Sequence, residues 1–393
     1  MKGFAVRRRL VGAGALALAS LLGAWSALLG VCGPFTDVAA DVFCPFVLEV
    51  FYMGITTGTT PTTYDPSGNT TRLQMAAFLS RTVDGVLTRG SRRAAMRRFW
   101  NPGNEANLGV TTVGGSAAVH VDSDGADIWA AGSNNVSRVR GSDGMLLETW
   151  TAAFAHNVLT AFGKVFVTGA SDPGRLYRID PTQAAGFATS VATNLGDSPF
   201  GIAYDGARIW TANFGDGSVG TGSVSIATVA ATVPWTVTTV TTGFSQMRGA
   251  LWDGTSIWVT DQNAGKLFRL SPGGAILQTV TVGTVPGRPV FDGTNIWVPN
   301  DTSNSVSVVR ASTGVLLLTL TGNGLDGPIV AAFDGLRVLV TNNTGASVSL
   351  WKAADLSAIG SLSTGAGSTP FGACSDGISF WIALSNKGTV ARF

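Results

Sequence analysis

Few side chains in this sequence have the chemistry that catalysis requires. The chain has two histidines, His120 and His156, and histidine is the usual general base near neutral pH. Its three cysteines do not combine with these histidines into a spacing typical of zinc sites. Cys32 and Cys44 are close in sequence and bracket a short segment, so we predict that they form a disulfide. Cys374 lies in an apolar stretch and is expected to be a small buried hydrophobic residue.

A repeated pattern fills the larger, C-terminal part of the chain. Each copy leads through apolar residues to Asp-Gly and then to a hydrophobic residue followed by tryptophan. Successive glycines are 38, 43, 48, 39, 42 and 42 residues apart, and this period predicts a mainly β fold, a seven-bladed β-propeller over residues 106–393. The copies, two of them degenerate, are Asp124 to Trp129, Phe162 to Phe166, Asp205 to Trp210, Asp253 to Trp258, Asp292 to Trp297, Asp334 to Leu339 and Asp376 to Trp381.

The ends of the repeat region predict how the ring closes. The last copy stops at Phe393 after three expected strands, whereas residues 108–113 echo residues 277–282, the expected fourth strand of another copy. We therefore predict that residues 108–113 complete the seventh blade and leave no open edge. The tryptophans are expected in the blade cores, and the Asp-Gly aspartates are expected to form turns rather than to bind metal. A second set of turn residues is expected three positions after the tryptophan: Asn213, Asp261, Asn300 and Asn342.

The same register predicts which side chains surround one opening of the central channel. The residue five positions before each Asp-Gly aspartate should lie near this opening, and none of the seven is acidic. We therefore predict no catalytic residue, no metal and no cofactor. Aromatic rings and two arginines would suit an anionic or sugar-like ligand, although ordinary loop chemistry is the alternative. The predicted ligand-binding residues are His156, Asn157, Phe200, Arg248, Arg288 and Phe371.

The repeats resemble those of YVTN and NHL propellers and, more loosely, those of the streptogramin-lyase family. The resemblance covers Val119–Phe393 and implies the fold rather than an activity, because propellers host many activities. A lyase of this type would need a histidine with a nearby glutamate in the later blades, where this sequence has none. A surface lyase or hydrolase that uses His156 stays as the alternative function.

The N-terminus carries the features of an export signal. Lys2 and Arg7–Arg9 precede an uncharged apolar run, and Ala24-Trp25-Ser26 is a small-x-small cleavage site. We predict a signal peptide over residues 1–30, with an uncleaved membrane anchor as the alternative. Removing its four positive charges takes the formal net charge from +2 to −2, so the basic pI gives no support for nucleic-acid binding.

Residues 31–90 form a separate predicted module with two amphipathic helices. Phe35-Thr36-Asp37-Val38, Gly54–Gly58, Tyr64-Asp65-Pro66 and Thr71-Arg72 occur in the order seen in S-layer homology (SLH) domains, which this segment resembles. The resemblance implies attachment to cell-wall polysaccharide or peptidoglycan, with Thr71 and Arg72 contacting the polymer. The alternative is a module that only trimerises or packs on the propeller. In the second helix, apolar residues at helical spacing are expected to face the core: Leu73, Met75, Ala76, Phe78 and Leu79.

These observations lead to one preferred function and two alternatives. Residues 91–105 are predicted to connect the SLH-like module to the propeller. We expect an exported cell-surface protein whose non-catalytic propeller binds an unknown protein or glycan, and no nucleic acid. The alternatives are the surface lyase or hydrolase named above and a purely structural component of a surface layer.

Overall fold

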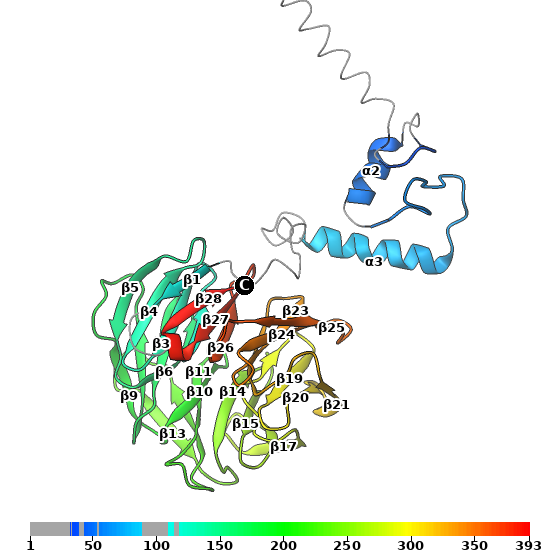
Figure 1. Ribbon diagram of the computed structural model, residues 1–393. Coiled ribbons are helices and arrows are strands. Elements are labelled where there is room, and N and C mark those ends of the chain that lie inside the picture. Colours follow the sequence, from blue (N-terminus) through cyan, green and yellow to red (C-terminus); the bar gives the residue numbers. More distant parts are fainter. Residues whose placement is uncertain (1–31, 33, 39–42, 53–54, 89–108, 114–117) are drawn as a thin grey trace, which may run out of the picture. The chain divides into compact units, whose positions relative to one another are not determined.

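The computed structural model describes residues 32, 34–38, 43–52, 55–88, 109–113 and 118–393. The predicted signal peptide, residues 1–30, and the predicted connector, residues 91–105, lie outside the described residues (Figure 1). The described residues fall into two compact units, one within Met1–Phe99 and one within Trp100–Phe393. Neither described helix is both long and apolar enough to cross a lipid bilayer.

The second unit is a seven-bladed β-propeller. In the described part of the chain, seven antiparallel sheets have four strands each, and each blade follows the last along the chain (Figure 1). Blades one to three are β2 (His120–Ser123), β3 (Asp127–Gly132), β4 (Asn135–Arg140), β5 (Leu146–Thr151); β6 (Ala155–Ala161), β7 (Lys164–Gly169), β8 (Gly174–Ile179), β9 (Thr189–Leu195); β10 (Pro199–Tyr204), β11 (Arg208–Asn213), β12 (Ser223–Thr228), β13 (Thr236–Val240).

Blades four to six continue the same order. They are β14 (Met247–Trp252), β15 (Ile257–Asp261), β16 (Lys266–Leu270), β17 (Ile276–Thr281); β18 (Val290–Phe291), β19 (Asn295–Asn300), β20 (Ser305–Arg310), β21 (Val315–Thr321); β22 (Pro328–Phe333), β23 (Arg337–Asn342), β24 (Ser347–Lys352), β25 (Ala358–Ser363). The second strands are buried along almost their whole length, because neighbouring blades cover both of their faces.

Blade seven is assembled from both ends of the propeller. Its first three strands are β26 (Pro370–Ser375), β27 (Phe380–Leu384) and β28 (Thr389–Arg392), with a 3-10 turn at Ser385–Lys387. The outer strand is β1 (Gly109–Thr112), which pairs antiparallel with β28 from Gly109 opposite Arg392 to Thr112 opposite Thr389 (Figure 1). The ring therefore closes as the sequence predicts, through a strand that precedes blade one.

The Asp-Gly pairs tie each turn to the tryptophan of the following strand. In blade four, Asp253 Oδ1 accepts the backbone N–H groups of Thr255 at 2.7 Å and Ser256 at 2.6 Å. Asp253 Oδ2 accepts the indole N–H of Trp258 at 2.7 Å. Gly254 has a φ of +92°, which glycine adopts without strain. The indole bond recurs at 2.7 to 2.9 Å in Asp124–Trp129, Asp205–Trp210, Asp292–Trp297 and Asp376–Trp381.

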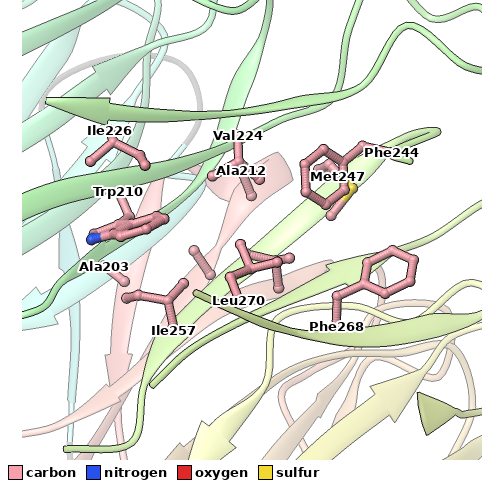
Figure 2. Close-up of a cluster of buried hydrophobic side chains, with 12 residues drawn as sticks. Ala203, Trp210, Ala212, Val224, Ile226, Phe244, Met247, Ile257, Phe268 and Leu270 are labelled. Atoms are coloured by element: carbon pink, nitrogen blue, oxygen red, sulfur yellow. The ribbon is translucent and has the colours of Figure 1, made fainter. Parts of the chain in front are cut away.

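The tryptophans fill the space between adjacent blades. Figure 2 shows the cluster between blades three and four, where Trp210 packs with Ile226 from β12 and Ile257 from β15. Trp210 is 1 % exposed, and the tryptophans at the equivalent positions of four other blades are equally buried. Flat side chains suit this place because twisted sheets leave a wedge-shaped gap between them.

The polar residues three positions after the tryptophan differ from the prediction. Asp261 does form a turn, since its Oδ1 accepts the backbone N–H of Ala264 at 3.0 Å. The three asparagines are instead fully buried, and each donates from Nδ2 to two serines of the next strand. For Asn213 these are Ser223 at 3.0 Å and Ser225 at 2.9 Å. The buried amide needs such partners, and serine on the adjacent strand supplies them within the blade.

The first unit has a small core around a disulfide. Cys32 and Cys44 are joined by a disulfide with 5.6 Å between their Cα atoms, and α2 (Cys44–Tyr52) begins at the second cysteine. Phe35 is 1 % exposed and meets Phe51 of α2 edge to face. The carboxylate of Asp37 accepts the backbone N–H groups of Tyr64 and Asp65, at 2.9 and 2.7 Å. These bonds join the motif at residues 35–38 to the motif at residues 64–66.

The second helix of this unit, α3 (Arg72–Thr88), does not bury the face that the sequence predicts. Leu73 is 84 % exposed and Leu79 is 59 % exposed, Met75 and Ala76 are also exposed, and only Phe78 is half-buried. A single module of this size has too little apolar surface to surround both helices. The helical periodicity therefore predicts the helix correctly, but its prediction of which residues are buried is wrong.

Candidate ligand site at the mouth of the propeller channel

The mouth of the central channel is formed where the first strand of each blade begins. The second residue lies there in four of these strands: His156 in β6, Phe200 in β10, Arg248 in β14 and Phe371 in β26. In each case the pairing with the next strand shifts register across this residue. A β-bulge re-aims the side chain at its position. The four side chains consequently face one common space.

A small cavity occupies this space. Its volume is about 40 Å³, and it is lined by His120, His156, Phe200, Arg248, Arg288, Ile329, Val330 and Phe371. Five of the six residues predicted from the sequence are among them. The sixth, Asn157, is fully buried beside the cavity. Its Oδ1 accepts Arg288 Nη1 at 2.9 Å, and its Nδ2 donates to the carbonyl of Phe200 at 2.6 Å.

Glycines behind the mouth let the first strands approach closely. A Cβ at Gly201, next to Phe200, would lie 2.7 Å from the backbone nitrogen of Ala250. A Cβ at Gly372, next to Phe371, would lie 2.5 Å from the Cα of His120. Both distances are shorter than real Cβ contacts allow, so glycine is required for adjacent blades to place their mouth residues side by side.

Aromatic rings form a continuous wall around the cavity. The rings of His156 and Phe200 are stacked, with 4.3 Å between their centroids and 14° between their planes. Phe200 stacks in turn on Phe214 at 5.1 Å. His120 lies 5.2 Å from His156 and 5.2 Å from Phe371, which it meets edge to face. The wall therefore offers flat apolar faces with few polar atoms.

Two arginines at the mouth have only neutral hydrogen-bond partners. Arg288 donates from Nη1 to Asn157 and lies 3.5 Å from His120 Nδ1. Arg248 donates from Nη1 to Gln262 Oε1 at 2.6 Å, and its guanidinium lies 5.9 Å from the ring centroid of Phe371. In the part of the chain that the structure describes, the ion pairs within 4 Å involve neither arginine.

Burial lowers the pKa of both arginines and of both histidines at the mouth. It lowers the pKa of the Arg248 and Arg288 guanidinium groups, which stay charged because arginine begins from a very high pKa. Burial, with the charge of Arg248 added, lowers the pKa of His156 to about 3. Burial and the charge of Arg288 hold the pKa of His120 well below its usual value. Both imidazoles are therefore neutral at physiological pH.

Sequence reasoning missed several groups near the mouth. His120 lines the cavity, although the sequence placed it only in a first strand. Two carboxylates also act on the arginines from outside the cavity lining, Asp301 on Arg248 and Asp122 on Arg288. Burial raises the pKa of both carboxyl groups. Across the described residues, no three His, Cys, Asp or Glu side chains gather closely enough to hold a metal ion.

A wider cavity lies along the channel beyond the mouth. Its volume is about 460 Å³, and Arg288 lines both this cavity and the smaller one. Asp122 lines the wider cavity and accepts the backbone N–H and the hydroxyl of Thr160, at 2.7 and 3.1 Å. Cys374 lines it too, and burial raises the pKa of this thiol well above its usual value. Arg288 thus stands between the mouth and the channel.

The predicted polymer-contacting residues lie at the start of α3. Thr71 caps this helix: its Oγ1 accepts the backbone N–H of Gln74 at 3.2 Å, and Gln74 Oε1 accepts the backbone N–H of Thr71 at 2.8 Å. Arg72 is the first residue of α3 and is exposed. A helix N-terminus with an exposed arginine suits an anionic group, since the free N–H groups there carry partial positive charge.

Comparison with known proteins identifies the first module. Residues 34–76 match the S-layer homology domain, so the chain carries an SLH domain near its N-terminus. Domains of this family generally bind cell-wall polymers, and their presence implies a location at the cell surface or in the cell envelope. No curated protein matches this chain.

The propeller is similar in fold to several solved structures. A streptogramin B lyase is 15 % identical, with a TM-score of 0.57, over 74 % of this chain and 96 % of that one. A virginiamycin B lyase from Staphylococcus aureus is 13 % identical, with a TM-score of 0.58, over 72 % and 97 %. A hydrazine synthase from Kuenenia stuttgartiensis is 12 % identical, with a TM-score of 0.61, over 72 % and 97 %. At such identities the likeness concerns the fold alone.

Proposed function

We propose that this is an exported protein, that its SLH domain attaches it to cell-wall polysaccharide or peptidoglycan, and that its propeller is a non-catalytic module binding a protein or glycan at the channel mouth. The predicted signal peptide over residues 1–30 would direct export. The observation that carries the binding role is the mouth itself, where Arg248 and Arg288 have only neutral hydrogen-bond partners and adjoin an aromatic wall.

Attachment rests on the first unit. Arg72 is exposed at the N-terminus of α3, and Thr71 holds that N-terminus in shape through its capping bonds with Gln74. The guanidinium is therefore free to reach an anionic substituent on a polymer beside the first turn of the helix. The disulfide between Cys32 and Cys44 holds the opposite part of the module together.

The test is co-sedimentation of the mature protein with isolated cell-wall sacculi. We expect the full mature chain to pellet and a variant without residues 34–84 to stay in solution. Arg72→Ala should weaken pelleting, whereas Arg140→Ala, which removes an exposed arginine from the propeller, should leave it unchanged. Equal pelleting of the protein with and without residues 34–84 would refute attachment through the SLH domain.

A surface lyase or hydrolase is the second candidate, favoured only by the position of His156 at the mouth. An imidazole whose pKa is about 3 is a weak general base, and no carboxylate among the described residues lines the cavity beside it. If the native protein has any such activity, His156→Gln should abolish it. Full activity in that variant would leave this candidate without support.

A further inference from the structure

We infer that the channel mouth binds a carboxylated sugar, such as a uronic acid unit, with its carboxylate between Arg248 and Arg288 and its ring against the aromatic wall of the mouth. This inference rests on the proposed binding role of the propeller and names the ligand class for it. Four features of the mouth lead to it: the unpaired charges, the small volume, the flat wall and an unused acceptor.

The charges point to an anion. Three other arginines of the propeller are paired with carboxylates: Arg138 lies 2.7 Å from Asp127, Arg208 lies 2.8 Å from Asp205, and Arg337 lies 2.8 Å from Asp334. Arg248 and Arg288 have amide and imidazole partners instead. A charged guanidinium in a desolvated place is stabilised far more by a carboxylate than by neutral acceptors. The ligand would supply the missing negative charge.

The size and lining of the cavity favour a single carboxylate over a phosphate or a sulfate. A volume of about 40 Å³ admits a small group and not a whole sugar ring. Four of the other lining residues, Phe200, Ile329, Val330 and Phe371, have apolar side chains that donate no hydrogen bonds to further oxygens. Asp301 and Asp122 act electrostatically on Arg248 and Arg288 from outside the cavity lining. Their negative charges would oppose a second negative charge on the ligand. Two planar guanidinium groups match the two oxygens of a carboxylate.

The remaining features favour a sugar as the carrier of that carboxylate. The rings of His120, His156, Phe200 and Phe371 line the cavity in contact with one another, and the C–H groups of a pyranose ring can pack on such an aromatic wall. His156 Nδ1 is buried and has no hydrogen-bond partner in the described part of the chain. A sugar hydroxyl would donate to this neutral nitrogen and satisfy it.

The experiment measures binding to the full mature protein by calorimetry. The probes are oligogalacturonate, the matched neutral oligogalactan, an acidic oligopeptide and inorganic phosphate. We expect oligogalacturonate to bind and the other three to bind at least about tenfold more weakly, since each lacks the carboxylate, the sugar ring or the single charge. Tighter binding of the peptide, the phosphate or the neutral sugar than of oligogalacturonate would overturn the inference.

Variants of mouth residues test whether oligogalacturonate binds at the mouth. Arg248→Met and Arg288→Met should each weaken oligogalacturonate binding at least about tenfold. Arg208→Met, at a paired arginine elsewhere in the propeller, should leave it unchanged. Asp301→Asn should strengthen it about two- to threefold, because it removes a repulsive charge near Arg248 without truncating the site. Unchanged affinity in the Arg248 variant, or weaker binding in the Asp301 variant, would refute the assignment.

Two controls separate failure of this inference from failure of the proposed function. Thermal unfolding of each variant shows whether it folds, and if Arg288→Met does not, the Arg248 and Asp301 variants decide the result. Pelleting with sacculi, measured in excess free oligogalacturonate with and without residues 34–84, reports on the SLH domain. If pelleting is normal and oligogalacturonate does not bind, only the ligand assignment is wrong. If the protein lacking residues 34–84 still pellets, the proposed attachment is wrong whatever binds at the mouth.

Discussion

Two sets of arginines in this propeller use one side chain in opposite ways. Three arginines are paired with carboxylates and stacked on aromatic rings: Arg138 over Trp129, Arg208 over Trp210 and Arg337 over Phe380, at 5.0 to 5.3 Å from the ring centroids. Arg248 and Arg288 at the mouth have neutral acceptors.

We interpret this difference as one between residues that stabilise the fold and residues that the proposed ligand would contact. A guanidinium with its own carboxylate and ring has its charge balanced within the blade, and its removal leaves a half-buried carboxylate behind. A guanidinium whose hydrogen-bond partners are neutral keeps a charge that no ion pair balances, and its burial costs desolvation free energy. Binding residues in an uncharacterised propeller are therefore better sought among unpaired arginines than among all arginines at its openings.

The largest expected effect on stability lies in the aspartate–tryptophan pairs. Trp258→Ala should lower the free energy of unfolding of the propeller by about 3–5 kcal/mol, because it removes a fully buried ring and leaves the carboxylate of Asp253 without its indole partner. Chemical denaturation measures this change. Trp252→Ala, at a half-buried tryptophan that lines the channel, is the matched control and should cost clearly less. Equal losses would contradict the comparison.

Acidification should lower the free energy of unfolding of the propeller through His156 at the mouth. The pKa of His156 is lowered from 6.5 to about 3 on folding, so between these values the unfolded chain binds more protons than the folded one. Stability is therefore fully present above about pH 6.5 and falls as the pH is lowered. From pH 7 to pH 5 this single group should remove about 2 kcal/mol.

The variant His156→Phe isolates that effect. Asp122 has a raised pKa, so its contribution changes with pH in the opposite sense, but it is common to both proteins and cancels in their difference. We expect the free energy of unfolding of the variant to fall less on acidification than that of the wild type, measured by denaturation at pH 7 and pH 5. Parallel pH profiles for the two proteins would show that His156 titrates normally in the fold.

The smallest expected effect distinguishes the two groups of arginines directly. Arg208→Met should lower the free energy of unfolding by about 1–2 kcal/mol, because Asp205, whose side chain is 6 % exposed, loses its ion-pair partner. Arg288→Met should leave the free energy of unfolding unchanged or raise it, because a buried charge without an ion pair is replaced by an apolar chain of similar length. Denaturant titration of both variants measures the two changes in the free energy of unfolding. A larger loss in Arg288→Met than in Arg208→Met would contradict the difference between the two sets of arginines.

Most of the propeller can be predicted from the sequence because its signal is repeated. The Asp-Gly pairs and the tryptophans recur at a fixed offset, and a pattern present in several copies locates even the degenerate ones. The closing strand could be predicted as well, since a missing strand at one end matched a spare one at the other. Carrying one register position around the ring located Phe200, Arg248 and Phe371, and the residues beside that position added His156 and Arg288.

What the sequence does not contain is the direction of individual side chains. His120 and Asp122 are on β2, but which of its residues faces the mouth depends on where the first strands shift register, and a shift of one residue turns a side chain to the other face. Asp301 acts electrostatically on Arg248 from a turn of the next blade, an influence that no local pattern encodes. The exposure of Leu73 and Leu79 likewise depends on how much surface surrounds α3, not on helical spacing.

The closing strand has a mechanical consequence. The chain that links the SLH domain to the propeller enters the ring through β1, whose four residues pair with β28. Tension between the wall and a ligand held at the mouth would therefore pass through this short ladder before it reached any other blade. Under sufficient pull β1 would peel from β28 first, leaving blade seven with three strands while blades one to six kept their own four. The seam that completes the propeller is also the place where it would yield.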